Sequence, residues 1–139
     1  MGEPVHCSVQ TVRFQHCDPA GIVFYPRYFE MLNLTVEHFF EQKVGWSFNG
    51  LPKELNVSVP TVHIETDFVK VSRLEDRLEF QLRILRIGRT SLGLAITGLC
   101  NGEERLKVAI TLVCVDFDTK AAVPWPDRLR MKLEALMKG

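Results

Sequence analysis

Apolar and polar residues alternate through much of the second half of the chain and through a short stretch near its start. An alternation of period two is typical of a β-strand with one face buried and the other exposed. The pattern predicts five strands, over residues 5–14, 57–69, 76–85, 91–100 and 106–114. Asn101-Gly102 lies between the last two, and this dipeptide favours a tight turn between antiparallel neighbours. A second tight turn is expected around Ile87-Gly88.

A different spacing begins at Pro26 and continues to about residue 43. Apolar residues recur there every three to four positions, which predicts an amphipathic helix. The stripe consists of Phe29, Leu32, Val36, Phe39 and Phe40, and Lys43 interrupts it. Pro26 suits the first turn of a helix, and Gly45 suits the position just past its end.

The remaining segments complete an α+β layout. Residues 46–56 contain Gly50 and Pro52 and are expected to form an irregular connector, and residues 127–138 are expected to form a short charged helix. Consecutive strands with an apolar face need a cover, and the long helix is the one strongly apolar candidate. We therefore expect a curved antiparallel five-stranded sheet wrapped around one central helix. At 139 residues, the chain is expected to form a single domain over 1–139.

Composition narrows the classes of protein. Lys and Arg total 17, as do Asp and Glu, so net charge gives no indication of nucleic-acid binding. No apolar run approaches the ~20 residues of a membrane span, and the first residues lack the pattern of a signal peptide. The four cysteines show no CxxC spacing. A cytoplasmic protein with reduced thiols is the expectation from these features.

The turn Asp18-Pro19-Ala20-Gly21 places a carboxylate just ahead of the long helix. Asp, Pro and Gly occupy the positions that they prefer in a type I turn, and by itself such an Asp is more often structural than catalytic. Cys17 is an alternative nucleophile, but its adjacent partner His16 would point to the opposite face of an extended segment. The residues around Asp18 decide whether it is structural or catalytic, or whether Cys17 is the nucleophile.

The segment from Phe14 to Tyr28 contains D-P-A-G-I-V-F-Y-P, and it closely resembles hot-dog fold acyl-CoA thioesterases of the 4-hydroxybenzoyl-CoA thioesterase type. The order of the elements and the chain length are also similar. The resemblance implies a hot-dog fold, a homodimer or homotetramer, and hydrolysis of an acyl-CoA or acyl carrier protein thioester without a metal or redox cofactor. The acyl group is left open between an aromatic one such as 4-hydroxybenzoyl and a short chain.

The resemblance also implies roles for particular residues. Asp18 matches the catalytic carboxylate, as general base or as nucleophile, and Tyr25 matches the residue whose backbone N–H polarises the thioester carbonyl. Preorganised N–H donors at a helix start suit the charge that develops on that oxygen. Thr61 is expected at the border of the active site. The candidates for the CoA phosphates are Arg86, Arg89, Thr90 and Ser91, although the family is richer in basic residues there.

Two other classes of function remain as alternatives. A hydratase or dehydratase on the same fold needs a His base with a carboxylate partner, and His16 and Asp18 are the only such pair near the helix start. A non-catalytic ligand-binding module would leave the Asp18 motif without a role. His63, Glu65 and Asp67 share one strand face, but no second cluster completes a metal site, so no metal is expected.

The strand over residues 57–69 is expected at an edge of the sheet. An unpaired edge is a liability unless it is covered. Val57, Val59 and Val69 are expected on the same side as the polar His63, Glu65 and Asp67. We therefore expect this edge to pair with its twofold copy in a homodimer and to bring it close to Asp18 of the partner. Further pairing is expected through the small residues Gly93 and Ala95.

Overall fold

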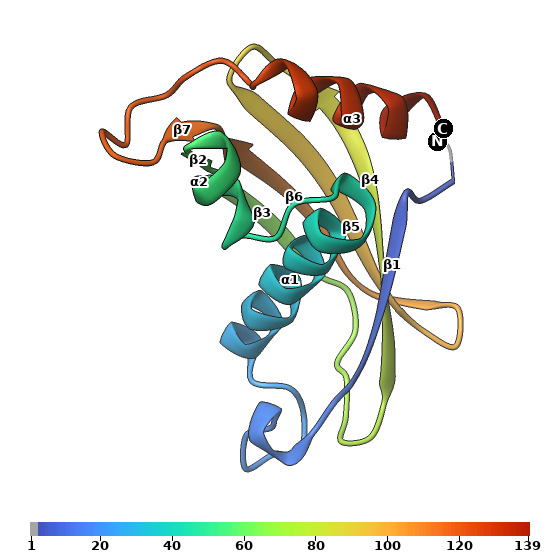
Figure 1. The fold of residues 1–139 in the computed structure, drawn as a ribbon. Helices are drawn as coiled ribbons and strands as arrows, with labels where there is room; N and C mark the ends of the chain where they lie inside the picture. Colours follow the sequence, from blue (N-terminus) through green and yellow to red (C-terminus); the bar gives the residue numbers. More distant parts are fainter. Residues whose placement is uncertain (1–2) are drawn as a thin grey trace.

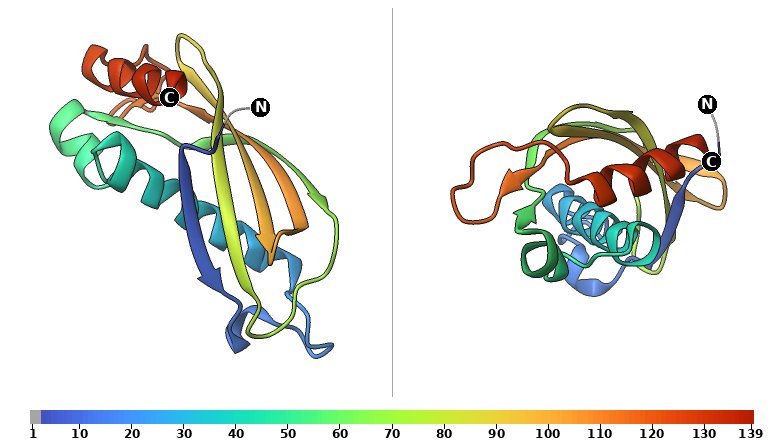
Figure 2. Two further views of the ribbon diagram at one scale, coloured as in Figure 1. Left: turned by 90° about the vertical axis from the view of Figure 1, so that its right-hand side faces the viewer. Right: turned by 45° about the horizontal axis from the view of Figure 1, so that its top comes forward.

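A curved antiparallel sheet wraps around one long helix in the computed structural model, which describes residues 3–139 (Figure 1). The helix is α1 (Tyr25–Phe39). The sheet contains, in spatial order, β1 (His6–Thr11), β4 (Arg77–Ile87), β5 (Ser91–Cys100), β6 (Glu103–Val113) and β3 (Thr61–Phe68). Figure 2 shows how the sheet curls around the helix axis. The predicted α+β architecture is confirmed, and β3 lies at an edge of the sheet.

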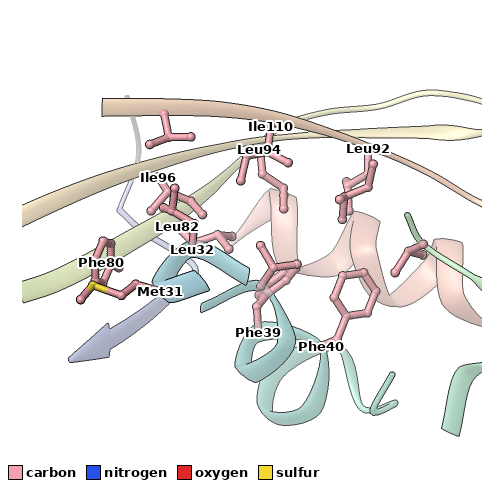
Figure 3. Packing of buried hydrophobic residues seen from close by; sticks show 14 of the residues in the cluster. Met31, Leu32, Phe39, Phe40, Phe80, Leu82, Leu92, Leu94, Ile96 and Ile110 are labelled. Atoms are coloured by element: carbon pink, nitrogen blue, oxygen red, sulfur yellow. The ribbon is translucent and has the colours of Figure 1, made fainter. Parts of the chain in front are cut away.

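The core lies between α1 and the concave face of the sheet (Figure 3). Side chains from the helix and from the three central strands meet there without solvent contact. The largest fully buried ones include Phe39, Phe40, Met31, Leu32, Phe80, Leu82, Leu92, Leu94 and Ile96. Each Phe or Leu side chain removed from water in this way stabilises the fold by about 1.5–3 kcal/mol.

The end of α1 departs from regular α-helix. Residues Phe40–Val44 form a π-helical turn, in which the N–H of Gly45 donates to the carbonyl oxygen of Phe40 at 2.7 Å. The wider turn places Val44, which is 1% exposed, at the buried position that α-helical spacing assigns to Lys43. This explains why the apolar stripe is interrupted at Lys43. Gly45 then ends the helix with φ 104°, as predicted.

Two glycines of β5 allow close packing on opposite faces of the sheet. A Cβ atom on Gly98 would lie 2.4 Å from Cδ2 of Leu106 on the concave side, and one on Gly93 would lie 2.5 Å from a guanidinium nitrogen of Arg86. Arg86 pairs with Gly93 in the register of β4 and β5. The small residues on the outer face of β5 therefore leave room for the side chain of Arg86.

Two sequence predictions about the middle of the chain are wrong. The expected connector 46–56 contains a helix, α2 (Gly50–Leu55). The expected strand 57–69 is divided into β2 (Val57–Ser58) and β3, because Pro60 between them has no N–H to donate to a ladder. β2 pairs instead with β7 (Val115–Asp116), which buries Val57 and Val59. These two valines do not belong to the exposed edge.

Other boundaries differ by a few residues. β1 ends at Thr11, three residues before the predicted end at Phe14, and a 3₁₀ turn (Phe14–His16) follows it. The turn at Asn101-Gly102 is confirmed, with φ values of 51° and 80°.

The terminal helix α3 (Asp127–Lys138) has the predicted bounds, and it lies across the end of the sheet where β4 turns into β5 (Figure 1). Its Arg130 donates to the carbonyl oxygen of Gly88 in that turn at 2.9 Å.

The buried imidazole of His6 makes stability depend on pH. His6 is 3% exposed, and neither ring nitrogen has a hydrogen-bond partner among the described residues. Burial, and then the charges of Lys43 and His38, lower the pKa of His6 below its ordinary 6.5. Unfolding therefore takes up a proton at pH values between the lowered pKa and about 6.5, so the free energy of unfolding falls as pH falls through this window.

We predict that the substitution His6→Leu reduces the loss of stability between pH 7.5 and pH 5, because the variant lacks this proton uptake. Urea unfolding at a series of pH values measures the effect. The matched control is His63→Gln, since His63 is an exposed histidine of β3. An unchanged pH dependence in His6→Leu would contradict the role assigned to the imidazole.

Candidate active site

Residues 17–23 form a short hairpin between β1 and α1. The N–H of Gly21 donates to the carbonyl oxygen of Asp18 at 2.9 Å, and the N–H of Asp18 donates to that of Ile22 at 3.0 Å. Gly21 has φ 80°, a conformation that side chains disfavour. The tight turn predicted from Asp18-Pro19-Ala20-Gly21 is therefore present.

The carboxylate of Asp18 is held by its own turn. Its Oδ1 atom accepts the N–H of Ala20 at 2.9 Å, and the residue is half-buried. Within residues 3–139, no hydrogen bond or ion pair to its Oδ2 atom is found. One oxygen thus fixes the orientation of the side chain, and the other keeps its capacity to accept a hydrogen bond or a proton.

The start of α1 presents a free backbone donor next to this hairpin. The N–H of Phe24 donates to His16 and that of Arg27 donates back to Phe24, but the N–H of Tyr25 finds no acceptor in the described part of the chain. Pro26 follows and has no N–H, so Tyr25 is the exposed donor of this first turn. The helix dipole adds partial positive charge at the same place.

An apolar pocket of about 430 Å³ opens between these two features. Asp18 and Tyr25 both border it, together with Ile22, Val23, Phe24, Tyr28, Phe68, Val69, Lys70 and Val71. Phe68 at the end of β3 is the centre of an aromatic cluster, with ring centroids 6.1 Å from Tyr25 and 5.8 Å from Tyr28. The pocket is therefore lined mostly by apolar residues, and Asp18, Lys70 and the residue with the free N–H, Tyr25, also border it.

The other predicted site residues lie at the opposite end of the sheet. Phe68 marks the Asp18 end of β3 and Thr61 the far end, seven residues away, or about 23 Å at strand spacing. Leu112 of β6 pairs with both Thr61 and Leu92, so Thr61 lies near the β4–β5 turn. That turn carries Arg86, Arg89, Thr90 and Ser91. One chain alone does not bring these residues to Asp18.

The alternative roles considered for Cys17 and His16 find no support. The thiol of Cys17 contacts the carbonyl oxygen of Arg13 at 3.7 Å, and Nδ1 of His16 accepts the N–H of Arg13 at 2.8 Å. His16 is therefore engaged by the backbone and bonds to neither Cys17 nor Asp18. Burial lowers the pKa of His16.

On β3, His63 and Glu65 form a 3.2 Å contact with each other on the outer face of the strand. No metal-binding group of three or more His, Cys, Asp and Glu side chains is found within residues 3–139.

Sequence reasoning missed the segment that forms one wall of the pocket. Val69, Lys70 and Val71 lie between β3 and β4, and Ser72 beyond them accepts the N–H of Val23 at 2.9 Å. The exposed apolar residues Val69 and Val71 are the signal that could have indicated a binding surface.

Comparisons with known proteins identify the family of this chain. The family model described as "Thioesterase-like superfamily" matches residues 12–133. A 1,4-dihydroxy-2-naphthoyl-CoA hydrolase from Nostoc punctiforme is 30% identical over 128 residues, which cover 90% of this chain and 84% of the relative.

Solved structures show the same fold. A 1,4-dihydroxy-2-naphthoyl-CoA thioesterase from Synechocystis superposes with a TM-score of 0.82 at 16% identity, and covers 96% of this chain and 95% of its own. A thioesterase from Thermus thermophilus, solved with coenzyme A and Zn, superposes with a TM-score of 0.84 at 23% identity, and covers 100% and 98%.

The fold and the relatives define the class of protein as a hot-dog acyl-CoA thioesterase, an enzyme that hydrolyses acyl-CoA thioesters. The chain belongs to the Thioesterase-like superfamily. The resemblance seen in the D-P-A-G-I-V-F-Y-P segment is therefore confirmed at the level of family and fold. No helix within residues 3–139 is long and apolar enough to cross a bilayer.

Proposed function

We propose that this enzyme hydrolyses aromatic acyl-CoA thioesters at the pocket between Asp18 and the start of α1. The observation that carries the proposal is that Asp18 and Tyr25, the residue with the unpaired N–H, border one largely apolar pocket. A thioester carbonyl that enters this pocket would accept the N–H of Tyr25, and its carbon would face Asp18. This placement fits Asp18 as the base or nucleophile and Tyr25 as the backbone donor to the carbonyl oxygen, the roles that the family resemblance implies.

Two routes to hydrolysis start from the same arrangement. As general base, Asp18 takes a proton from water while the water oxygen bonds to the carbonyl carbon. The C–S bond then breaks, the proton held by Asp18 passes to the sulfur, and CoA leaves as the thiol. As nucleophile, a carboxylate oxygen bonds to the carbonyl carbon and displaces CoA, and water then hydrolyses the anhydride. In either route negative charge develops on the carbonyl oxygen, where the Tyr25 N–H and the helix dipole stabilise it.

The shape of the pocket favours an aromatic acyl group over a short chain. Phe24, Tyr25, Tyr28 and Phe68 supply flat surfaces, and aromatic rings stack or meet edge-to-face with a gain of about 0.5–1.5 kcal/mol beyond area burial. The relatives named for a naphthoyl thioester are consistent with such a substrate. A short aliphatic chain would leave most of these walls uncovered.

The complete site would need a second copy of the chain. Seven of the eight residues of β3 are exposed, including Val62 at 59% and Ile64 at 39%, and the outer backbone groups of this edge are unpaired in one chain. Antiparallel pairing of β3 with its twofold copy would set Thr61 of one chain beside Phe68 of the other. The far end of the sheet, with Arg86 and Arg89, would then approach the partner's Asp18 pocket and its bound CoA.

We predict that Asp18→Asn keeps the fold but lowers turnover of a hydrolysed acyl-CoA on the order of 100-fold or more, because amide nitrogen replaces the proton-accepting oxygen. Release of free thiol measures turnover, and circular dichroism checks the fold. Asp118→Asn, at an exposed turn distant from the pocket residues in sequence, is the matched control. Near-normal turnover in a folded Asp18→Asn protein would disprove the assignment.

We predict that aromatic thioesters are preferred. A panel of 1,4-dihydroxy-2-naphthoyl-CoA, 4-hydroxybenzoyl-CoA, butyryl-CoA and acetyl-CoA should show kcat/KM at least about tenfold higher for the aromatic members, since tenfold corresponds to about 1.4 kcal/mol of extra contact. The same thiol-release assay is used throughout. Equal or higher kcat/KM for the short-chain thioesters would contradict the proposed preference for aromatic acyl groups. It would not contradict the proposal that the enzyme hydrolyses acyl-CoA thioesters.

We predict that the active form is at least a homodimer. Sedimentation at micromolar concentration should show no monomer, and activity per chain should fall on dilution once the dimer dissociates, because each site would need residues from both copies. A fully active monomer would rule out both the shared site and the pairing of β3 edges.

A further inference from the structure

The wall of the pocket and the Asp18 hairpin are joined through one loop, residues 69–76. Its first part lines the pocket with Val69, Lys70 and Val71. Its middle holds the hairpin, since the carbonyl oxygen of Ser72 accepts the N–H of Val23. The backbone of Arg73 also forms an isolated antiparallel β-bridge with that of Ile22. The position of this loop therefore sets where Asp18 lies relative to the start of α1.

Arg105 of β6 is hydrogen-bonded to several residues of that loop. Its Nη1 atom donates to the carbonyl oxygen of Val71 at 3.1 Å, to Oγ of Ser72 at 3.2 Å and to Oδ2 of Asp76 at 2.7 Å. Its Nε atom donates to Oε1 of Glu103 at 2.8 Å. The backbone carbonyl oxygen of Arg105 also accepts the N–H groups of both Val69 and Lys70, at 2.8 and 3.1 Å.

The guanidinium and the serine that it contacts are sheltered from water, whereas Glu103 is 45% exposed. The side chain of Arg105 is only 14% exposed, and Ser72 is fully buried. Burial works against the charge of Arg105, but the hydrogen bonds to Asp76 and Glu103 outweigh it and raise its pKa. The backbone N–H of Arg73, and after it Arg105, hold the pKa of Asp76 below its ordinary value. The guanidinium therefore stays charged, and near neutral pH its hydrogen bond to the ionised Asp76 is retained.

Ser72 extends the network to α1. The phenol of Tyr28, a pocket residue that is 4% exposed, has a pKa raised by burial and partly restored by hydrogen bonding to Ser72. Ser72 thus lies close to a residue of the helix that carries the Tyr25 donor. Its carbonyl oxygen accepts the N–H of Val23 and so holds the hairpin that carries Asp18.

We propose that Arg105 is a positioning residue of the active site, which sets the distance between the Asp18 carboxylate and the Tyr25 N–H by holding loop 69–76. The proposal rests on the catalytic role proposed above for Asp18. It requires the planar fork of arginine, because a lysine ammonium at the end of a flexible stem does not reach Val71, Ser72, Asp76 and Glu103 together.

The test compares Arg105→Lys and Arg105→Met with Lys107→Met, an exposed cation two residues further along β6. Both Arg105 variants should lose about tenfold in kcat, as expected for a misplacement smaller than 1 Å, and the Lys107 variant should not. The amide of Val23 should exchange with solvent faster in the Arg105 variants, since its acceptor Ser72 is no longer held. All rates are taken well below the thermal midpoint of each variant.

A double-mutant cycle separates positioning from general damage. In an Asp18→Asn background, Arg105→Lys should leave the residual turnover within about twofold, because the group that it positions is already gone. An additional tenfold loss in that background would overturn the proposal, as would an unchanged kcat in folded Arg105→Lys alone. Normal turnover in Asp18→Asn would instead defeat the proposed function, so the two failures are distinguishable.

A milder substitution covers the case in which the Arg105 variants do not fold. Ser72→Ala keeps Arg105 and nearly the same volume but removes the hydroxyl that accepts a hydrogen bond from Arg105 at 3.2 Å. We expect a loss of about threefold in kcat with the same absence of effect in the Asp18→Asn background. Unchanged kcat in this folded variant would contradict the link through Ser72.

Discussion

The packing of α1 into the concave face of the sheet is the interaction on which the rest of the structure depends. The helix buries its stripe against β4, β5 and β6, and Phe39 and Phe40 are completely removed from solvent. Such an apolar contact fixes the helix both along and around its axis. The first turn, with its free donor at Tyr25, extends beyond this core and is held where the hairpin and the end of β3 meet it. A rigid core thus supports a small and partly open site.

Much of this could be predicted from the sequence because its causes are local. The turn at Asp18, the αL conformation at Gly45 and the bounds of α3 follow from residue preferences over a few positions. The alternation within β4, β5 and β6 follows from burial of one face. Asp18 and Tyr25 border one pocket for the same reason, since only six residues lie between them and the turn returns the hairpin to the helix start.

The remainder depends on contacts between distant parts of the chain, which local pattern does not encode. Pro60 ends one pairing and β7 provides another, so the strand expected over 57–69 is divided. Thr61 and Asp18 were grouped by resemblance, yet the sheet holds them at opposite ends within one chain. In the sequence, Arg105 resembles any exposed cation on a β-strand. Its hydrogen bonds to loop 69–76 become visible only once the fold places β6 beside that loop.

The π-helical turn at Phe40–Val44 has a consequence for how this fold changes in length. A π turn contains one residue more than an α turn between the same two fixed ends. An extra residue is therefore accommodated at Phe40–Val44, and the core residues on either side keep their positions. Glu41 and Gln42 within it are exposed and bear none of the packing. Among proteins of this architecture, a chain one residue shorter at this point would continue as regular helix and still deliver a buried side chain to the position of Val44.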